Sequence, residues 1–148
     1  MADQAAPQLS AELMTELRTL TTDGFEHWRT NCTEEQKAAG LVELEKFTSD
    51  PAFQGQIMGE MAASFASAGA NEAGLVNEAQ FCTFYAALMA SGASRGNFTD
   101  ARPDMVSRSY TLTNRVDPAT DGCSFADFMT LMGASMAMNE ELKAAAGL

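Results

Sequence analysis

The sequence predicts an all-α fold. Apolar residues recur at helical spacing along nearly the whole chain, as in Phe53, Ile57, Met61 and Phe65, which fall every four residues. No long run alternates between apolar and polar residues, so no long strand is expected. The chain has 148 residues, of which 46% are hydrophobic. This length suits one domain or two small lobes with a buried core.

Two helices are expected before residue 50. The first has Ser10 as its N-cap, and leucines lie at helical spacing around it: Leu9, Leu13, Leu17 and Leu20. The second opens at residues 33–36, where Thr-Glu-Glu-Gln is the sequence of a capping box. This second helix is expected to carry three apolar side chains inward: Leu41, Leu44 and Phe47.

Two further helices are expected between there and residue 99. Asp50 is a cap, followed by a proline in the first turn of the helix that carries the Phe53 stripe. Residues 67–74 form a loop of small residues, and residues 77–80, Asn-Glu-Ala-Gln, look like another capping box. The helix that follows presents one apolar face: Phe81, Phe84, Tyr85, Leu88 and Met89. Residues 91–99, rich in Gly and Ser, are expected to be a linker.

The last third of the chain is expected to form two more helices. One covers residues 102–116, with Pro103 near its start. A turn at residues 117–122 follows it. The last helix begins near Ser124 and carries its apolar residues on one face: Phe125, Phe128, Met129, Met132 and Met136.

Two places in the chain share one pattern. Each has a small polar turn with a Gly, then one apolar position, and then a capped helix with paired aromatic residues. The first is residues 74–84, with Val76 at the apolar position, and the second is residues 121–128, with Cys123 there. Here the chain resembles the EF-hand superfamily, and more broadly the calmodulin-like proteins, over roughly residues 50–140.

The resemblance implies an all-α fold with an EF-hand-like helix-loop-helix pair and additional N-terminal helices. Residues 49–148 would form the pair, with a linker near 91–99, and residues 1–48 an N-terminal helical region. A degenerate EF-hand lobe is the alternative for that N-terminal region. In such a pair, Val76 and Cys123 would face each other in a short antiparallel strand pair.

The first of the two loops lacks the ligands of a calcium site. In an EF-hand, about twelve residues wrap oxygen atoms around the ion, and a Gly makes the sharp turn. On residues 69–80, Gly74 takes that turn. The cation positions fall on four residues without a carboxylate: Gly69, Asn71, Ala73 and Gln80. Since no carboxylate offsets the dehydration of the ion, this loop is expected to keep the EF-hand shape and to have lost the ion.

The second loop keeps three carboxylates as candidate metal ligands: Asp117, Asp121 and Asp127. Counting the ligand positions from either end of this loop gives registers that differ by one residue. Pro118 and Ala119 remove a ligand at the third position. The expected cofactor is therefore none, or weakly bound calcium at a vestigial site. In the alternative interpretation, the first two aspartates belong to an ordinary turn, and Asp127 is the capping partner of Ser124.

The net charge limits the classes of partner that the protein can bind, and the cysteines indicate its cellular compartment. Nine Lys and Arg stand against twenty Asp and Glu, a net charge of −11. This charge disfavours nucleic acids and anionic membrane surfaces, and it suits cations or basic protein segments. No apolar run approaches the length of a membrane span, and no secretory signal is visible. The cysteines are spaced too widely for a zinc site, so free thiols in the cytoplasm are expected: Cys32, Cys82 and Cys123.

The sequence predicts a protein that is not an enzyme. It has one histidine, His27, and no nucleophile elbow, phosphate loop or dinucleotide fingerprint. The expected function is a non-catalytic calmodulin-like adaptor or light-chain-type subunit. It would bind an amphipathic basic helix of a protein target, with weak or lost calcium dependence. The alternatives are a calcium sensor or buffer that uses the 117–127 loop, and a structural component of a cytoskeletal or motile assembly.

The ten methionines and nine phenylalanines give the chain an adaptable apolar surface. The residues expected to contact a partner are five: Phe84, Met89, Met129, Met132 and Met136. Phe81 and Phe128, the first aromatic residues of the paired pattern, are expected in the core. For Met132 and Met136, ordinary core packing is the alternative.

Overall fold

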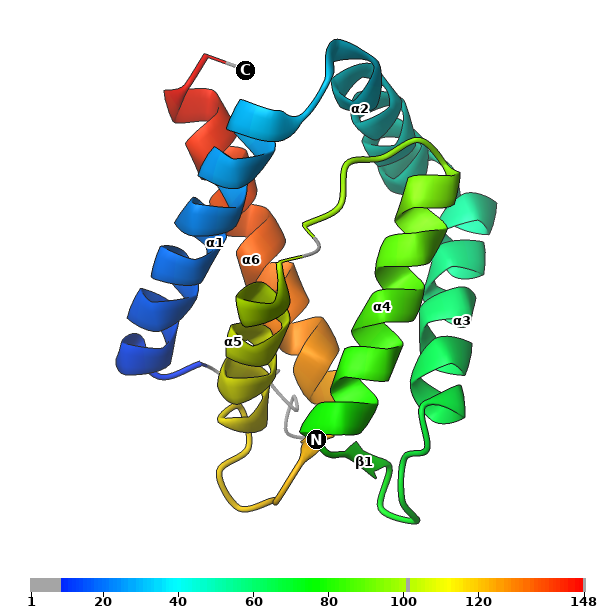
Figure 1. Ribbon diagram of the computed structural model, residues 1–148, viewed down its shortest axis with the longest axis vertical. Helices are drawn as coiled ribbons and strands as arrows, with labels where there is room; N and C mark the ends of the chain where they lie inside the picture. The colour runs from blue at the N-terminus through cyan, green and yellow to red at the C-terminus, as the bar shows by residue number, and fades with distance from the viewer. Residues whose placement is uncertain (1–8, 101, 148) are drawn as a thin grey trace, which may run out of the picture.

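The all-α prediction is confirmed by a computed structural model, which describes residues 9–100 and 102–147. Within these ranges there are six helices and one two-stranded sheet (Figure 1). In chain order the elements are α1 (Ala11–Asn31), α2 (Glu34–Ser49), α3 (Pro51–Ser67), β1 (Leu75–Val76), α4 (Glu78–Ser94), α5 (Pro103–Asn114), β2 (Cys123–Ser124) and α6 (Phe125–Ala145). None of these helices has both the length and the apolar character that crossing a membrane requires.

Side-chain caps fix where the helices begin. Both capping boxes predicted from the sequence are present, at Thr33 before α2 and at Asn77 before α4. A further capping box joins Ser124 and Asp127 at the start of α6. Asp50 accepts hydrogen bonds from two backbone amides in the first turn of α3. These bonds satisfy amide groups that have no partner within their own helix.

The linker predicted at residues 91–99 begins later than expected. Helix α4 continues through Ser94, because a Gly inside a helix weakens it without ending it. The helix stops where Gly96 adopts a φ of 85°, a conformation that favours glycine. The amide of Asn97 then donates back to the carbonyl of Gly92 at 3.0 Å.

The two strands pair as the sequence predicts. Val76 lies opposite Cys123 and Leu75 opposite Ser124, in antiparallel register. Gly122, just before β2, has a φ of 106°. A Cβ atom at this position would come within 2.8 Å of the backbone oxygen of Val76, so the close approach of the two strands requires glycine here.

A cluster of phenylalanines lies directly beside this strand pair. Phe81 and Phe84 on α4 are 0% exposed, and Phe128 on α6 is 7% exposed. The ring centroids of Phe84 and Phe128 are 4.9 Å apart, with an edge-to-face angle of 87°. This is a favourable geometry for two aromatic rings. The expectation that Phe81 and Phe128 belong to the core is confirmed.

A second apolar cluster joins the N-terminal helix to the last two helices. Helix α1 packs against α5 and α6, as Figure 1 shows. The buried residues of this cluster come from all three helices: Leu13, Leu17, Leu20, Met105, Leu112, Leu131 and Met138. The N-terminal leucines predicted to be periodic therefore share a core with residues more than 80 positions further along the chain.

The fold predicts that a substitution in the core lowers the free energy of unfolding far more than a substitution at the surface. Replacing Phe84 by Ala should lower the free energy of unfolding by about 3–5 kcal/mol, because it removes a ring that four other phenylalanines contact. Val42→Ala, at a side chain that is 66% exposed, should change it by less than about 0.5 kcal/mol. Urea denaturation measures both values. Equal effects of the two substitutions would contradict this description of the core.

Candidate functional site

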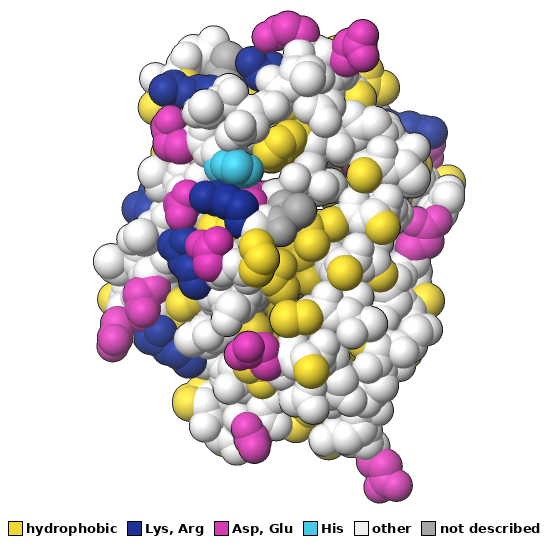
Figure 2. All heavy atoms as spheres, viewed as in Figure 1, with side chains coloured by type: hydrophobic (Ala, Val, Ile, Leu, Met, Phe, Trp, Pro, Cys, Tyr) yellow, Lys and Arg dark blue, Asp and Glu magenta, His cyan; other side chains and the backbone are white. Residues whose placement is uncertain are grey.

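An open apolar groove lies between the helices. Its volume is about 540 Å³, and its walls come from all six helices and from the segment that joins α4 to α5. A smaller cavity of about 340 Å³ adjoins it. The two share several lining residues, including Leu20, Tyr85, Phe98 and Met132. Figure 2 shows hydrophobic side chains gathered in the middle of one face, with Lys, Arg, Asp and Glu side chains grouped to one side of them.

Helix α2 forms one wall of the groove. The prediction that its apolar residues are carried inward is wrong for Leu41, which is 61% exposed, and α2 has no buried residue. The reason is that α3 is the helix that α2 mainly contacts, so no other helix closes over its apolar face. Three apolar side chains of α2 line the groove instead: Leu41, Leu44 and Phe47.

Helix α6 forms the wall that contains the predicted methionines. Met132 and Met136 both line the groove. Met136 is 38% exposed, whereas Met132 is half-buried and also packs against the phenylalanine cluster. Met132 therefore contributes to the core as well as to the groove, and the side chain of Met136 is free to meet a ligand. An unbranched thioether adapts to partners of different shape.

The other three residues predicted to contact a partner lie elsewhere. Met89 lines the smaller cavity, and Met129 is half-buried against the phenylalanine cluster. Phe84 offers no accessible surface, because Phe65, Phe125 and two further rings surround it. The structure thus corrects the prediction for Phe84, which is a core residue. From the sequence, it could not be distinguished from the groove residues, since both kinds of residue lie on apolar helical faces.

Three aromatic residues that line the groove were not predicted from the sequence: Phe25, Trp28 and Phe98. Trp28 lines the groove and stacks on Phe25, with ring centroids 5.7 Å apart. The ammonium group of Lys37 on α2 lies 5.9 Å from the centroid of the Trp28 ring. Phe98, on the segment before α5, lines both cavities. Trp28 could have been found from its spacing after Thr21 and Phe25, which continues the buried face of α1 by one helical turn.

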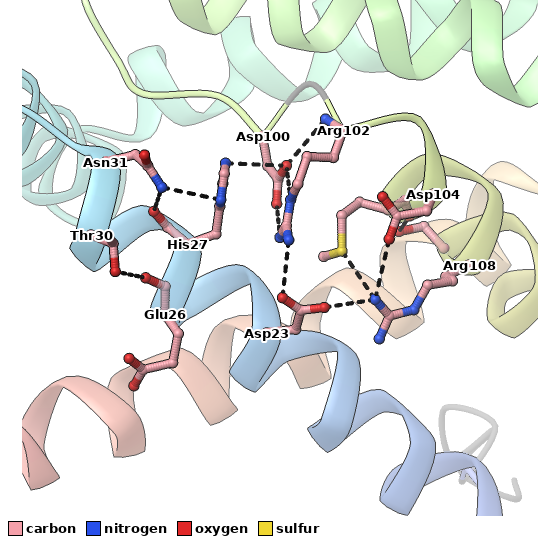
Figure 3. Close-up of polar contacts among 11 residues, drawn as sticks. Asp23, Glu26, His27, Thr30, Asn31, Asp100, Arg102, Asp104 and Arg108 are labelled. Atoms are coloured by element: carbon pink, nitrogen blue, oxygen red, sulfur yellow. Dashed lines mark hydrogen bonds and ion pairs between the residues drawn. The ribbon is translucent and has the colours of Figure 1, made fainter.

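Charged residues fasten the α4–α5 segment to α1. Figure 3 shows Arg102 between two carboxylates: its guanidinium donates to Asp100 at 2.7 Å and to Asp23 on α1 at 3.1 Å. Arg108 on α5 donates to the other oxygen of Asp23 at 2.7 Å. His27 Nε2 lies 3.8 Å from Asp100. This network holds Asp100 and its neighbour Phe98 against the wall formed by α1.

The arginines change the titration of these carboxylates. The hydrogen bond from Arg108 is the largest influence on Asp23, and with Arg102 it lowers the pKa of that carboxyl although burial opposes it. For Asp100, burial is the largest influence and would raise the pKa. The hydrogen bonds and charge of Arg102, together with His27, outweigh burial, so the pKa of Asp100 is lowered as well.

The first candidate cation loop is closed by its own hydrogen bonds. The Gln80 amide donates from Nε2 to the carbonyl of Gly69 at 2.7 Å, which joins the two ends of the loop. Its Oε1 accepts from the Asn77 amide at 2.9 Å. Asn71 Oδ1 accepts from the amides of Ala73 and Leu75, both at 3.0 Å. The side-chain oxygens of Asn71 and Gln80 are therefore already engaged within the loop.

The second loop does not bring its three aspartates together around a common centre. Asp127 Oδ2 accepts from the Ser124 amide at 3.1 Å, as the capping interpretation predicts, and Asp117 Oδ1 accepts from the Ala119 amide at 3.0 Å. Asp121 is exposed. In the described part of the chain, no three His, Cys, Asp or Glu side chains form a group that could hold a metal ion.

The loops predict weak affinity for calcium. Titration of the protein with Ca²⁺ by calorimetry should give a dissociation constant on the order of 10⁻⁴ M or weaker, because the loop oxygens are engaged in hydrogen bonds. If heat of binding is seen, Asp121→Ala should remove it, whereas Asn71→Ala should have little effect. A micromolar dissociation constant would show that the loops rearrange around the ion.

The charged network predicts a loss of stability in acid. Because the folded pKa values of Asp23 and Asp100 are depressed, the stability they contribute is fully present above the unfolded value of about 3.9. It is lost as the pH falls through the folded values. Denaturation by urea between neutral pH and about pH 3 should therefore show a smaller decrease for Asp23→Asn than for the wild type. Asp121→Asn, at an exposed carboxylate, is the control and should behave like the wild type.

Comparison with known proteins gives no match. No family model, no curated protein and no solved structure matches the chain. A function for this chain must therefore be argued from its own structure. Two features carry that argument: the apolar groove with methionines and aromatic residues in its walls, and the two paired loops that connect α3 to α4 and α5 to α6.

Proposed function

We propose that the protein is a non-catalytic, calmodulin-like adaptor that binds an amphipathic helix of a partner protein in the apolar groove. The groove is the single observation that carries this proposal. An amphipathic helix recognised in this way places apolar anchors at successive turns into a hydrophobic groove. The walls offer adaptable side chains at that spacing, since Met132 and Met136 lie one turn apart on α6, and Leu41 and Leu44 on α2 line the same groove.

The charge of the chain supports a basic partner. The net charge of −11 favours association with a helix that carries Lys and Arg on its flanks. On α2, next to the groove, the carboxylates of Glu35 and Glu45 are exposed and make no ion pair with any residue that the structure describes. They are available to the cationic side chains of a bound helix.

The arrangement of the two helix-loop-helix segments, α3–α4 and α5–α6, supports the calmodulin-like part of the proposal. Helices α3 and α4 flank β1, α5 and α6 flank β2, and the two strands pair antiparallel. This is the arrangement expected of an EF-hand-like pair. The internal hydrogen bonds of Asn71, Gln80 and Asp127 support weak or lost calcium dependence, because they hold both loops without an ion.

The cysteines support a binding protein and a cytoplasmic location. Burial raises the pKa of Cys123 to about 12 and also raises the pKa of Cys32, so both remain protonated at neutral pH and are poor nucleophiles. All three cysteines are free, as is usual in a reducing compartment.

Two adjacent residues of α2 provide a matched test of the groove. Leu41 lines the groove and is 61% exposed, whereas Val42 is 66% exposed and lies outside the groove lining. The probe is a synthetic amphipathic peptide built only of Leu and Lys. Its binding is followed through the fluorescence of Trp28, the single tryptophan. Leu41→Gln and Met136→Gln should each weaken binding about tenfold, since each removes an apolar contact worth about 1–2 kcal/mol.

Val42→Gln should bind the peptide within about twofold of the wild type, because its side chain does not face the groove. All three variants should keep their melting temperatures, since none of the replaced side chains is buried. Equal loss of binding in Leu41→Gln and Val42→Gln, or no change of Trp28 fluorescence with the wild type, would contradict the proposal.

A further inference from the structure

Helix α2 has fewer buried side chains than any other described helix. Over its 16 residues it has no buried side chain, whereas each of the other five helices has at least two. Three of its apolar residues, Leu41, Leu44 and Phe47, line the groove rather than a closed core. Elements with few buried contacts are the ones that open at low free-energy cost.

At each end of α2, only one or two residues in extended conformation connect it to the neighbouring helix. Cys32 and Thr33 separate it from α1, with ψ angles of 129° and 162°. Asp50 alone separates it from α3, with φ −117° and ψ 101°. Rotations at these few residues would move α2 as a rigid body, as hinge residues at element ends do in other proteins.

A small polar contact attaches α2 to the segment between α4 and α5. Glu43 accepts hydrogen bonds from Arg95 and from Asn97, the latter at 2.8 Å. The side chains of Glu43 and Arg95 are 27% and 32% exposed, so water screens their attraction. Asn97 Oδ1 is buried and has no hydrogen-bond partner among the described residues, which makes this contact incomplete.

The position of α2 sets the width of the groove along one side. Three of its apolar side chains line the groove: Leu41, Leu44 and Phe47. Anchors at positions i, i+4 and i+7 of a bound helix extend over two turns, a length of about 11 Å. A displacement of α2 would therefore change the space that is available to all of these anchors.

We propose that α2 is the movable wall of the groove: it swings outward about residues 32–33 and 50 to admit the partner helix, and the Glu43 contact with Arg95 and Asn97 holds the narrower form. This inference rests on the proposed function, because it names how access to that groove is controlled. A partner that enters must break the Glu43 contact, so the strength of this contact sets part of its affinity.

A reversible cross-link tests the movement. A Cβ atom built on Gly96 would lie 3.7 Å from the Cβ of Ala39 on α2, a separation that a disulfide can bridge. The double variant Ala39→Cys with Gly96→Cys, once oxidised, should fix α2 against the α4–α5 segment. Mass spectrometry of proteolytic fragments verifies the cross-link between positions 39 and 96. The same protein, reduced, is the matched control and also accounts for strain at Gly96, whose φ is 85°.

The probe is the Leu-Lys peptide, followed by Trp28 fluorescence. The oxidised variant should bind it at least about tenfold more weakly than the reduced variant. Equal affinity of both forms would overturn the movable wall and leave the proposed groove intact. Failure of the wild type to bind the peptide would instead contradict the proposed function, and the movement of α2 is then decided by hydrogen exchange.

Hydrogen exchange of the free protein reports the movement without a ligand. Once α2 has swung away from its neighbours, it is a helix of 16 residues without tertiary contacts, and such a helix opens its own hydrogen bonds readily. The amides of α2 should exchange at least about 100-fold faster than those of α4, whose phenylalanines are fully buried. Glu43→Gln should speed exchange in α2 further, whereas Glu45→Gln, on the same helix and outside the contact, should not. Protection of α2 equal to that of α4, or equal effects of the two substitutions, would overturn the inference.

Discussion

The position of four helices depends on the pairing of Val76 with Cys123. The two strands comprise only two residues each, but each is followed at once by a capped helix, α4 or α6. Their antiparallel register therefore fixes where Phe81 and Phe128 enter the core. The pairing in turn requires Gly122, because a side chain there would collide with the backbone of Val76. One glycine and one pair of apolar residues thus bring together segments almost 50 residues apart in the chain.

The features that depend on local chemistry could be predicted from the sequence. The capping boxes at Thr33 and Asn77 follow from side chains three residues apart, and the helical faces follow from apolar spacing. The pairing of Val76 with Cys123 could be predicted because the two loops share one sequence pattern. Methionines on α6 were identified as candidate contacts, and Met132 and Met136 do line the groove.

The features that depend on long-range placement could not be predicted. The apolar face of α2 has the same pattern as a buried face, but α1 packs on α5 and α6 and leaves that face uncovered. On α4, side chains of α3 and α6 cover the same pattern at Phe84, which is why Phe84 lies in the core. The network of Asp23, Asp100 and Arg102 joins residues far apart in sequence, so spacing carried no signal for it.

The two loops are held by hydrogen bonds and by the buried core, whereas helix α2 has no buried residue. This difference matters for how binding in the groove would be controlled. In an ion-dependent EF-hand pair, the ion supplies the free energy that repositions the helices. Here Gln80 joins the ends of the first loop, and Asp127 caps α6, so hydrogen bonds within the chain hold parts of both loops. The helices that they connect share the phenylalanine cluster, which resists displacement. Helix α2 contributes no buried residue to this arrangement; it packs on α3, and Glu43 joins it to the segment after α4. Under the proposed function, control of the groove would therefore pass from an ion in the loops to the contacts of a single helix.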